Sequence, residues 1–252
     1  YIEGINDLNG DGKKEIIAGG GVDCNNRIYC LNGANGELLW NRNFPATIQS
    51  LSVSKDLDQN GYEEIIVNCA DFKVYLINGR DGSIIWTFAT ANQTWWCKPV
   101  TIKDVNNNGI DDIITGTENG TIYCIEGSSG QQIWSVKLSY STHSIATIYD
   151  INGDNINEVI IGIRFDGVVC LDGKTGAQLW ERSLCYTWIV ENVGDIDNDG
   201  NEEIAAGLNC YAMYLLSATD GTIKWTYNCP WYFVNYIRKG DDINRDGIPD
   251  IL

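Results

Sequence analysis

The sequence predicts an all-β fold, a β-propeller of four-stranded antiparallel blades with about 47 residues each. An acidic loop pattern recurs six times, at intervals of 45 to 49 residues. Between these loops, a hairpin pattern that ends in tryptophan recurs five times. No helical periodicity interrupts the two patterns. Repeats of this length, with four short strands in each, are typical of propeller blades.

The order of the elements is clearest in the second repeat. Its first strand is expected over about residues 48–55, before the acidic loop, and the others near 64–69, 73–78 and 83–89. The repeats begin near residues 1, 48, 98, 144, 189 and 235, so five are complete and the sixth contains only its first two strands. An unpaired strand edge promotes aggregation. We therefore expect residues 1–252 to form a single propeller domain that is part of a longer chain or is completed by another chain.

Each acidic loop has Asp at its first position, Asp or Asn at the third and fifth, and Asp or Glu at the ninth. The sixth position is Gly in five loops and Asn155 in the fourth, and both residues tolerate a left-handed backbone. Apolar β-type residues follow the ninth position, which indicates that the loop joins two strands. Alternate residues of such a loop can direct oxygens toward one point, and the carbonyl of the seventh residue can complete the set.

Hard divalent cations prefer oxygen ligands of this kind, so the loops predict up to six Ca²⁺ sites. The ligands expected at positions one, three, five, seven and nine are Asp7, Asn9, Asp11, Lys13, Glu15; Asp56, Asp58, Asn60, Tyr62, Glu64; Asp104, Asn106, Asn108, Ile110, Asp112; Asp150, Asn152, Asp154, Ile156, Glu158; Asp195, Asp197, Asp199, Asn201, Glu203; and Asp242, Asn244, Asp246, Ile248, Asp250.

The alternative interpretation is a set of Asx turns in acidic hairpins that bind no metal. Six copies with their acids in phase favour the metal site. The fifth loop has four carboxylates and is predicted to bind calcium most tightly. The third loop has only two, Asp104 and Asp112, and is predicted to be the weakest site.

The composition narrows the class of protein. The chain has 252 residues, of which 44% are apolar, and no apolar run is long enough to span a membrane. It has no starting Met, signal peptide or basic targeting segment, so we expect a mature form, an excised domain or the ordered part of a longer chain. The net charge of −17 argues against nucleic acid as a partner. Of the 34 acidic residues, 18 are proposed ligands, so the acidity mostly reflects the loops.

Nine cysteines suit an oxidising compartment, and their odd number leaves at least one unpaired. The chain has no CxxC pair and a single His, which argues against zinc and covalent haem. Two disulfides within single repeats are expected, Cys69–Cys97 and Cys210–Cys229, and Cys24 lies in the same kind of region. Third-strand positions hold three cysteines that we expect to be buried as small apolar residues, namely Cys30, Cys124 and Cys170.

The hairpin pattern consists of an apolar strand, a turn that ends in Gly and a second strand that ends in Trp. Its five copies are RIYCLNGANGELLW (27–40), KVYLINGRDGSIIW (73–86), TIYCIEGSSGQQIW (121–134), GVVCLDGKTGAQLW (167–180) and AMYLLSATDGTIKW (212–225).

This hairpin resembles the tryptophan-docking repeat of quinoprotein-like (PQQ-like) propellers. The acidic loop resembles the cation loops of FG-GAP propellers, including integrin α-subunits. Together the two resemblances cover nearly the whole chain. They imply that adjacent blades are locked by Trp40, Trp86, Trp134, Trp180 and Trp225, and that a metal ion sits in the loop between the first two strands of each blade.

Links between repeats emerge at the end of each blade opposite to the acidic loops and are rich in aromatic residues. These aromatic side chains could stack on sugar rings or bind a protein partner, or they could instead cap the core. His143 could be a general base, but the sequence offers it no obvious carboxylate partner. The candidates for this ligand face are Trp95, Trp96, Tyr140, His143, Tyr186, Trp188, Trp231, Tyr232 and Phe233.

The leading hypothesis is an extracellular or cell-surface calcium-binding propeller that acts as a structural, adhesion or surface-assembly module and has no catalytic residues. One alternative is a calcium-dependent polysaccharide lyase or hydrolase, because calcium-loaded propellers include ones that resemble eight-bladed rhamnogalacturonan lyases, although the chain is short for that fold. A quinone-dependent dehydrogenase is disfavoured, since the chain is short and lacks a vicinal cysteine pair. The half repeat also suggests self-assembly by β-augmentation.

Overall fold

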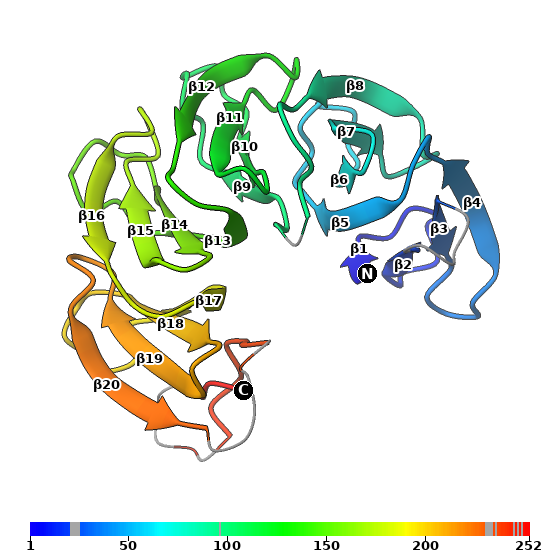
Figure 1. The fold of residues 1–252 in the computed structure, drawn as a ribbon. Coiled ribbons are helices and arrows are strands. Elements are labelled where there is room, and N and C mark those ends of the chain that lie inside the picture. Colours follow the sequence, from blue (N-terminus) through cyan, green and yellow to red (C-terminus); the bar gives the residue numbers. More distant parts are fainter. Residues whose placement is uncertain are drawn as a thin grey trace. The chain divides into compact units, whose positions relative to one another are not determined.

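The computed structural model describes residues 1–20, 26–95, 97–229, 234, 236–243, 245, 247 and 249–252. This part of the chain contains β-strands and no helix. The strands form five four-stranded antiparallel sheets, each from four consecutive strands, and these sheets are the blades of a β-propeller (Figure 1). The predicted fold class is therefore confirmed. The contacts divide the chain into two units, Tyr1–Ile133 and Trp134–Leu252.

The first unit contains the first two sheets and most of the third, since the boundary falls within β12. The strands of these three sheets are β1 (Ile2–Ile5), β2 (Glu15–Gly19), β3 (Arg27–Leu31), β4 (Leu38–Asn43), β5 (Ile48–Val53), β6 (Glu64–Cys69), β7 (Lys73–Asn78), β8 (Ile84–Ala89), β9 (Val100–Ile102), β10 (Asp112–Gly116), β11 (Thr121–Ile125) and β12 (Gln132–Lys137).

The second unit contains the fourth and fifth sheets. Their strands are β13 (Thr142–Ile148), β14 (Glu158–Ile163), β15 (Gly167–Leu171), β16 (Gln178–Arg182), β17 (Thr187–Gly194), β18 (Glu203–Leu208), β19 (Ala212–Ser217) and β20 (Ile223–Asn228). In the second repeat, β5 to β8 match the predicted strands to within two residues at each end.

The second strand of a blade is its most buried element. Every residue of β6, β10, β14 and β18 is buried, whereas the fourth strands β4, β8, β12 and β16 expose about every other side chain. Inner strands are apolar on both faces because adjacent blades pack face to face. In the first unit, Ile17 and Ile28 of one blade pack in one core with Leu51 and Ile65 of the next. The second to fifth acidic loops are thus each anchored at one end of a fully buried strand.

The sixth repeat was expected to supply two strands. Its described residues pair antiparallel through a bridge between Lys239 and Ile251, with the Arg238 N–H donating to the Leu252 carbonyl at 3.0 Å. Nearby, Ile237 is buried in a core with Val193 and Leu215. A search for helices that are long and apolar enough to cross a membrane finds none among the described residues.

Candidate metal centre

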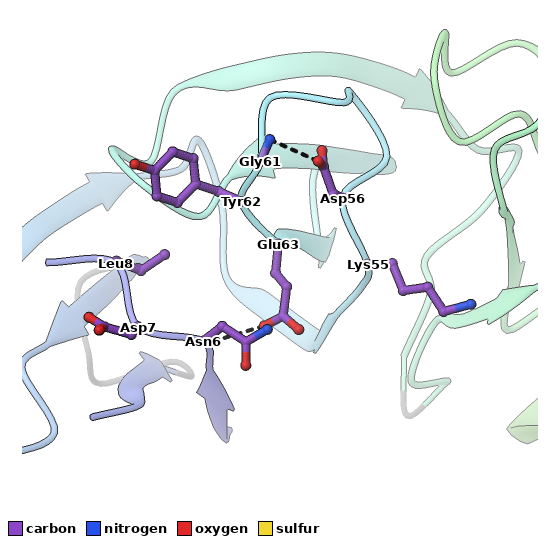
Figure 2. A pocket seen from close by; sticks show the side chains of 8 residues that line it. All are labelled: Asn6, Asp7, Leu8, Lys55, Asp56, Gly61, Tyr62 and Glu63. Atoms are coloured by element: carbon purple, nitrogen blue, oxygen red, sulfur yellow. Dashed lines mark hydrogen bonds between the residues drawn. The ribbon is translucent and has the colours of Figure 1, made fainter. Parts of the chain in front are cut away.

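Each acidic loop folds around the carboxylate of its first residue. The backbone N–H of the sixth residue donates to this carboxylate in all six loops. Figure 2 shows the bond from Gly61 to Asp56, which is 2.8 Å long. The other pairs are Gly12–Asp7, Gly109–Asp104, Asn155–Asp150, Gly200–Asp195 and Gly247–Asp242. The first carboxylate therefore closes the loop.

The predicted left-handed backbone at the sixth position is confirmed in every loop, including Asn155 with φ of 70°. The sequence did not reveal that the fourth position is also left-handed. Gln59 and Arg245 adopt positive φ there, although longer side chains rarely do so. Two left-handed residues in each loop turn the backbone N–H groups inward and bring the side chains of positions one, three and five together.

Positions three and five form a succession of Asx turns. In the first loop, the Asp11 N–H donates to Asn9 Oδ1 at 2.8 Å, and the Lys13 N–H donates to Asp11 Oδ1 at 2.9 Å. The same bond from residue seven to residue five recurs at Tyr62, Ile110, Ile156 and Asn201. These bonds place the seventh residues at the loop, while the role of their carbonyl oxygens stays a prediction. Asx turns are common without metal, so they do not decide between the two interpretations.

The ninth position is different, because its carboxylate is buried. The side chains of Glu15, Glu64, Asp112, Glu158 and Glu203 are at most 1% exposed. In the third, fourth and fifth loops, the N–H of the second loop residue donates to this carboxylate, as in the 2.8 Å bond from Val105 to Asp112. However, both oxygens of Glu15 and the Oε1 atoms of Glu64 and Glu203 are buried without a hydrogen-bond partner. A buried charge without a partner is costly, so these oxygens call for a cation.

Burial also shifts the acidity of these groups. Burial first, and then the charges of neighbouring carboxylates, raise the pKa of Glu64 to about 8 and that of Asp112 to about 6. The pKa values of Glu15, Glu158 and Glu203 are raised in the same way, with burial as the largest cause. A bound divalent cation would offset this penalty by stabilising the ionised form.

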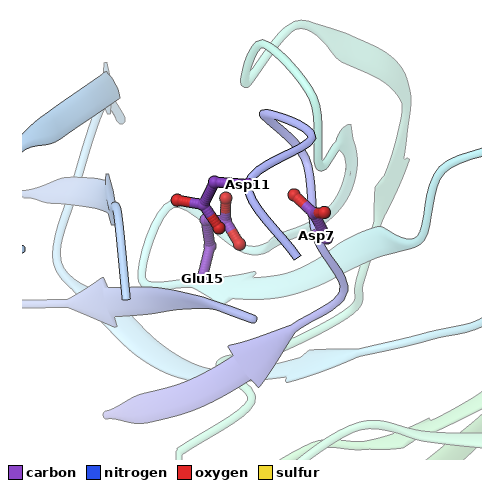
Figure 3. A group of neighbouring side chains, drawn as sticks. All are labelled: Asp7, Asp11 and Glu15. Atoms are coloured by element: carbon purple, nitrogen blue, oxygen red, sulfur yellow. The ribbon is translucent and has the colours of Figure 1, made fainter. Parts of the chain in front are cut away.

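Carboxylates converge in three of the loops. In each group below, one oxygen from every carboxylate lies within 4.8 Å of the others, and Figure 3 shows the first group. The groups are Asp7, Asp11 and Glu15; Asp56, Asp58 and Glu64; and Asp195, Asp197 and Asp199. An oxygen-only donor set with orphaned buried carboxylate atoms fits a hard divalent cation.

The third and sixth loops differ in detail. In the third loop, Asn108 Nδ2 donates to Glu126 Oε1 at 2.6 Å. A carboxylate from the turn of the following hairpin thus contacts a loop that has only two carboxylates of its own. Sequence reasoning missed Glu126 because it lies outside the pattern. In the sixth loop, the Ile243 N–H donates to Asp250 Oδ2 at 2.7 Å. The proposed ligands Asn244, Asp246 and Ile248 lie outside the described residues.

Position eight, which the pattern did not assign, connects successive loops. The Asn6 N–H donates to Glu63 Oε2 at 2.9 Å (Figure 2), and the Tyr149 N–H donates to Glu202 Oε2 at the same distance. A cavity of about 260 Å³ lies between the first and second loops and is lined by Asn6, Asp7, Leu8, Lys55, Asp56, Gly61, Tyr62 and Glu63. The first and second loops, and likewise the fourth and fifth, are therefore linked by hydrogen bonds to acids that are not proposed ligands.

Three of the predicted ligand-face residues come together in the second unit. His143 is buried, its Nε2 lies 3.2 Å from the Tyr186 hydroxyl, and its ring packs edge-on against Trp188. Trp95 and Tyr140 are exposed. The candidates Trp96, Trp231, Tyr232 and Phe233 lie outside the described residues.

Sequence reasoning missed the basic residue of this cluster. The Arg164 guanidinium lies 4.9 Å from the centre of the Phe165 ring and 5.5 Å from that of Tyr186. Burial, and then the charge of Arg164, lower the pKa of His143 to about 4. The imidazole is therefore neutral at physiological pH.

The predicted disulfide pairing is wrong. Cys210 is bonded to Cys185, whereas Cys69 and Cys229 are free thiols. The first and second strands of a blade are antiparallel, so the first strand begins beside the end of the second. The link that precedes the blade therefore meets the loop between the second and third strands. The link that follows the blade does not. The 2.9 Å bond from the Asn209 N–H to the Tyr186 carbonyl shows this pairing. Cys30, Cys124 and Cys170 are fully buried, as predicted, and Cys24 lies outside the described residues.

Tryptophan docking is confirmed for four of the five hairpins. The Trp86 indole N–H donates to the Gly127 carbonyl at 2.8 Å, and a Cβ at Gly130 would lie 2.6 Å from the ring. Equivalent bonds join Trp40 to Gly79, Trp134 to Gly173 and Trp180 to Ala218. The turn glycine is therefore needed both for its positive φ and for the close approach of the indole.

Comparison with known proteins supports this architecture. Three solved structures illustrate the similarity. BBS1N in complex with ARL6DN, soaked with lead, has a TM-score of 0.72 at 13% identity, with 95% of this chain and 71% of that chain covered. The computationally designed Ika8 protein has a TM-score of 0.68 at 13% identity, with 90% and 62% covered. The C-terminal WD40 domain of Sif2 has a TM-score of 0.66 at 16% identity, with 92% and 59% covered.

At these identities the similarity concerns the fold alone. No curated protein matches the sequence significantly. The family model described as outer membrane protein assembly factor BamB matches residues 15–156 and 118–230. Because these two stretches together span most of the chain, and because its blades carry the Trp-docked hairpin, the protein belongs to this family of PQQ-like repeat propellers.

Proposed function

We propose that this chain is a calcium-stabilised propeller that acts as an extracellular or cell-surface interaction module. The observation that carries the proposal is the buried carboxylate at position nine of the first five loops, with oxygens at Glu15 and Glu64 that lack hydrogen-bond partners. Calcium accepts irregular sets of oxygen ligands and would neutralise these groups. The resemblance of the loops to FG-GAP cation loops supports the same metal.

Calcium in these loops is structural. The ninth residue begins the buried second strand of its blade, whereas the first residue follows the first strand, so one ion would fasten the two strands together. A ligand that binds only the folded state stabilises that state by mass action. Calcium is abundant outside cells, so even loops that have few carboxylates and bind it weakly would be occupied there. The disulfide between Cys185 and Cys210 supports the same location.

The partner is a protein or a glycan that contacts the end of the blades where exposed aromatic residues gather. In the second unit, Tyr140, Phe165 and Tyr211 are at least 44% exposed. Phe165 and Tyr211 have positive φ, which is unfavourable for aromatic residues and is often associated with binding sites. The propeller of the similar BBS1N structure was solved in complex with a protein, ARL6DN.

Thermal unfolding in calcium and in excess chelator tests the structural role. The proposal requires a clear fall in Tm when calcium is removed and full recovery when calcium, rather than magnesium, is restored. Tm values that are equal in both buffers would refute it. A separate experiment tests the interaction role by measuring the binding of the chain to glycans and to cell surfaces. The double variant Phe165→Ala, Tyr211→Ala is the control.

A further inference from the structure

The fifth acidic loop contains a cation that belongs to the chain itself. Lys224 Nζ lies 2.7 Å from Asp197 Oδ2, 2.5 Å from Asp199 Oδ2 and 3.6 Å from Glu203 Oε1. These acids hold positions three, five and nine of the loop. Glu203 is fully buried, and its Oε1 has no hydrogen-bond partner. The ammonium thus occupies the point at which the ligand side chains converge.

The backbone explains why this lysine reaches the loop. In four blades, the residue before the docking Trp is the extra residue of a β-bulge between the third and fourth strands. A bulge redirects its side chain relative to the regular strand. The bulge residues are Leu39, Ile85, Leu179 and Lys224. Only the fifth blade has a charged residue at this place, so the long side chain is directed toward the acids of its own blade.

Another lysine gives a useful contrast. Lys174 Nζ lies 3.8 Å from Asp154 Oδ2 of the fourth loop, which is an ion pair with a single carboxylate at its edge. Lys224 contacts three carboxylates, and its side chain is 24% exposed. A lysine at the rim of a loop leaves the ligand oxygens available, whereas Lys224 uses the same oxygens that a metal ion would need.

We propose that Lys224 is a tethered counter-ion that replaces calcium in the fifth loop and keeps this blade folded without metal. This inference rests on the proposed function, since it assumes that the other loops bind calcium. It reverses the ranking based on the number of carboxylates: the loop with the most acids has the lowest apparent calcium affinity, because calcium must displace the ammonium. Calcium can bind only when the ammonium has moved away. The apparent calcium affinity of the fifth loop therefore falls in proportion to the fraction of molecules in which Lys224 has left the loop.

The test counts calcium ions by calorimetric titration of the full chain, with metal analysis after dialysis as a second readout. Lys224→Leu places the aliphatic residue type of the other bulges in the fifth blade. It is expected to bind one more calcium ion than the wild type, with an affinity at the new site about tenfold or more above that of the wild-type loop. The double variant Lys224→Leu, Glu203→Gln is expected to lose the added ion. Lys73→Leu, which removes a lysine paired with Asp71 at 3.7 Å, leaves the count unchanged.

A reciprocal variant keeps the proposal testable if the first one folds poorly. Leu179→Lys introduces an ammonium at the bulge of the fourth blade, where the side chain is 38% exposed. It is expected to lose one calcium ion while it keeps its fold in chelator. If the wild type binds calcium and the ion count is unchanged in both Lys224→Leu and Leu179→Lys, this inference is overturned and the proposed function is not. No calcium on the wild type at all overturns the proposed function instead.

Discussion

The buried carboxylate of Glu64 accepts a hydrogen bond from the backbone N–H of Leu57, which is the second residue of the same loop. Its Oε1 atom is buried and has no hydrogen-bond partner. One oxygen of this side chain therefore organises the loop, and the carboxylate has an oxygen within 4.8 Å of oxygens of Asp56 and Asp58. The arrangement is favourable only when a cation or a proton neutralises the group.

Glu64→Gln tests this relationship directly. In chelator, the variant is expected to be at least as stable as the wild type, because a neutral amide is less costly to bury than a carboxylate. In calcium, it is expected to be less stable by about 1–3 kcal/mol, because one ligand is lost. Urea unfolding in both buffers measures the two differences. The variant Glu63→Gln, at the neighbouring half-buried residue, is the control and should not change the response to calcium. Equal responses of both variants would contradict this account.

The raised carboxyl pKa values predict how stability depends on pH without calcium. Glu64 has a folded pKa of about 8 and Asp112 one of about 6, both above their ordinary values. The folded state therefore binds these protons more tightly than the unfolded state does. The stability that they contribute is fully present below the unfolded pKa values and is lost as the pH rises through the folded ones. Unfolding in chelator should thus become easier between about pH 5 and pH 8.

Calcium should reverse this slope, because its binding would favour the ionised carboxylates. Thermal unfolding across the same pH range, with and without calcium, provides the comparison. In Glu64→Gln, the loss of stability above pH 6 should be smaller than in the wild type. A calcium-free wild type that gains stability toward pH 8 would show that the buried carboxylates are paired in some other way.

Asn155 offers a test of the loop backbone. It has φ of 70° at the position where the other five loops have Gly. Asn155→Gly is expected to be neutral or slightly stabilising, whereas Asn155→Ala should lower the free energy of unfolding by about 1–2 kcal/mol, because alanine tolerates this conformation poorly. Denaturant unfolding of both variants measures the difference. Equal stability of the two would mean that the loop does not need a left-handed residue here.

The docked tryptophans should contribute unequally to stability. Trp86 is 8% exposed and donates to Gly127, whereas Trp225 is 40% exposed. Trp86→Phe leaves the Gly127 carbonyl without this donor and should cost about 1–3 kcal/mol. Trp225→Phe should stay within about 0.5 kcal/mol of the wild type, as surface substitutions usually do. Thermal unfolding of the two variants measures the difference. A larger loss of stability in Trp225→Phe than in Trp86→Phe would be inconsistent with this docking.

The Cys185–Cys210 disulfide should be detectable by mass spectrometry of non-reduced peptides. Cys185→Ser is expected to lower the free energy of unfolding by about 2–4 kcal/mol, because the bond constrains the unfolded chain. Cys229→Ser removes a free thiol and should have little effect. A peptide that links Cys210 to Cys229 would restore the pairing expected from the sequence and contradict the structure.

The fold and the loops were predictable because their signals are local. An acidic loop of nine residues and a hairpin of fourteen carry their own turn chemistry, and their repetition removes the ambiguity of a single copy. For the same reason the burial of Cys30, Cys124 and Cys170 could be predicted from one strand position. The left-handed Asn155 followed from its alignment with five glycines.

Contacts between distant parts of the chain could not be predicted in this way. Asn6 and Glu63 are 57 residues apart and meet only because successive blades pack together. Cys185 meets Cys210 because of the side of the sheet on which the first strand lies, which the sequence does not specify. Lys224 reaches the fifth loop through a β-bulge that has no sequence signature, and a ranking by carboxylate number overlooks it.

The most direct test of the account is the number of calcium ions bound by the purified wild-type chain after dialysis against millimolar calcium. The account predicts that several ions are bound per chain, and that Glu64→Gln removes one of them while Glu63→Gln removes none. A chain that binds no calcium under these conditions, with its five four-stranded blades intact, would contradict the central claim that the buried ninth-position carboxylates are metal ligands.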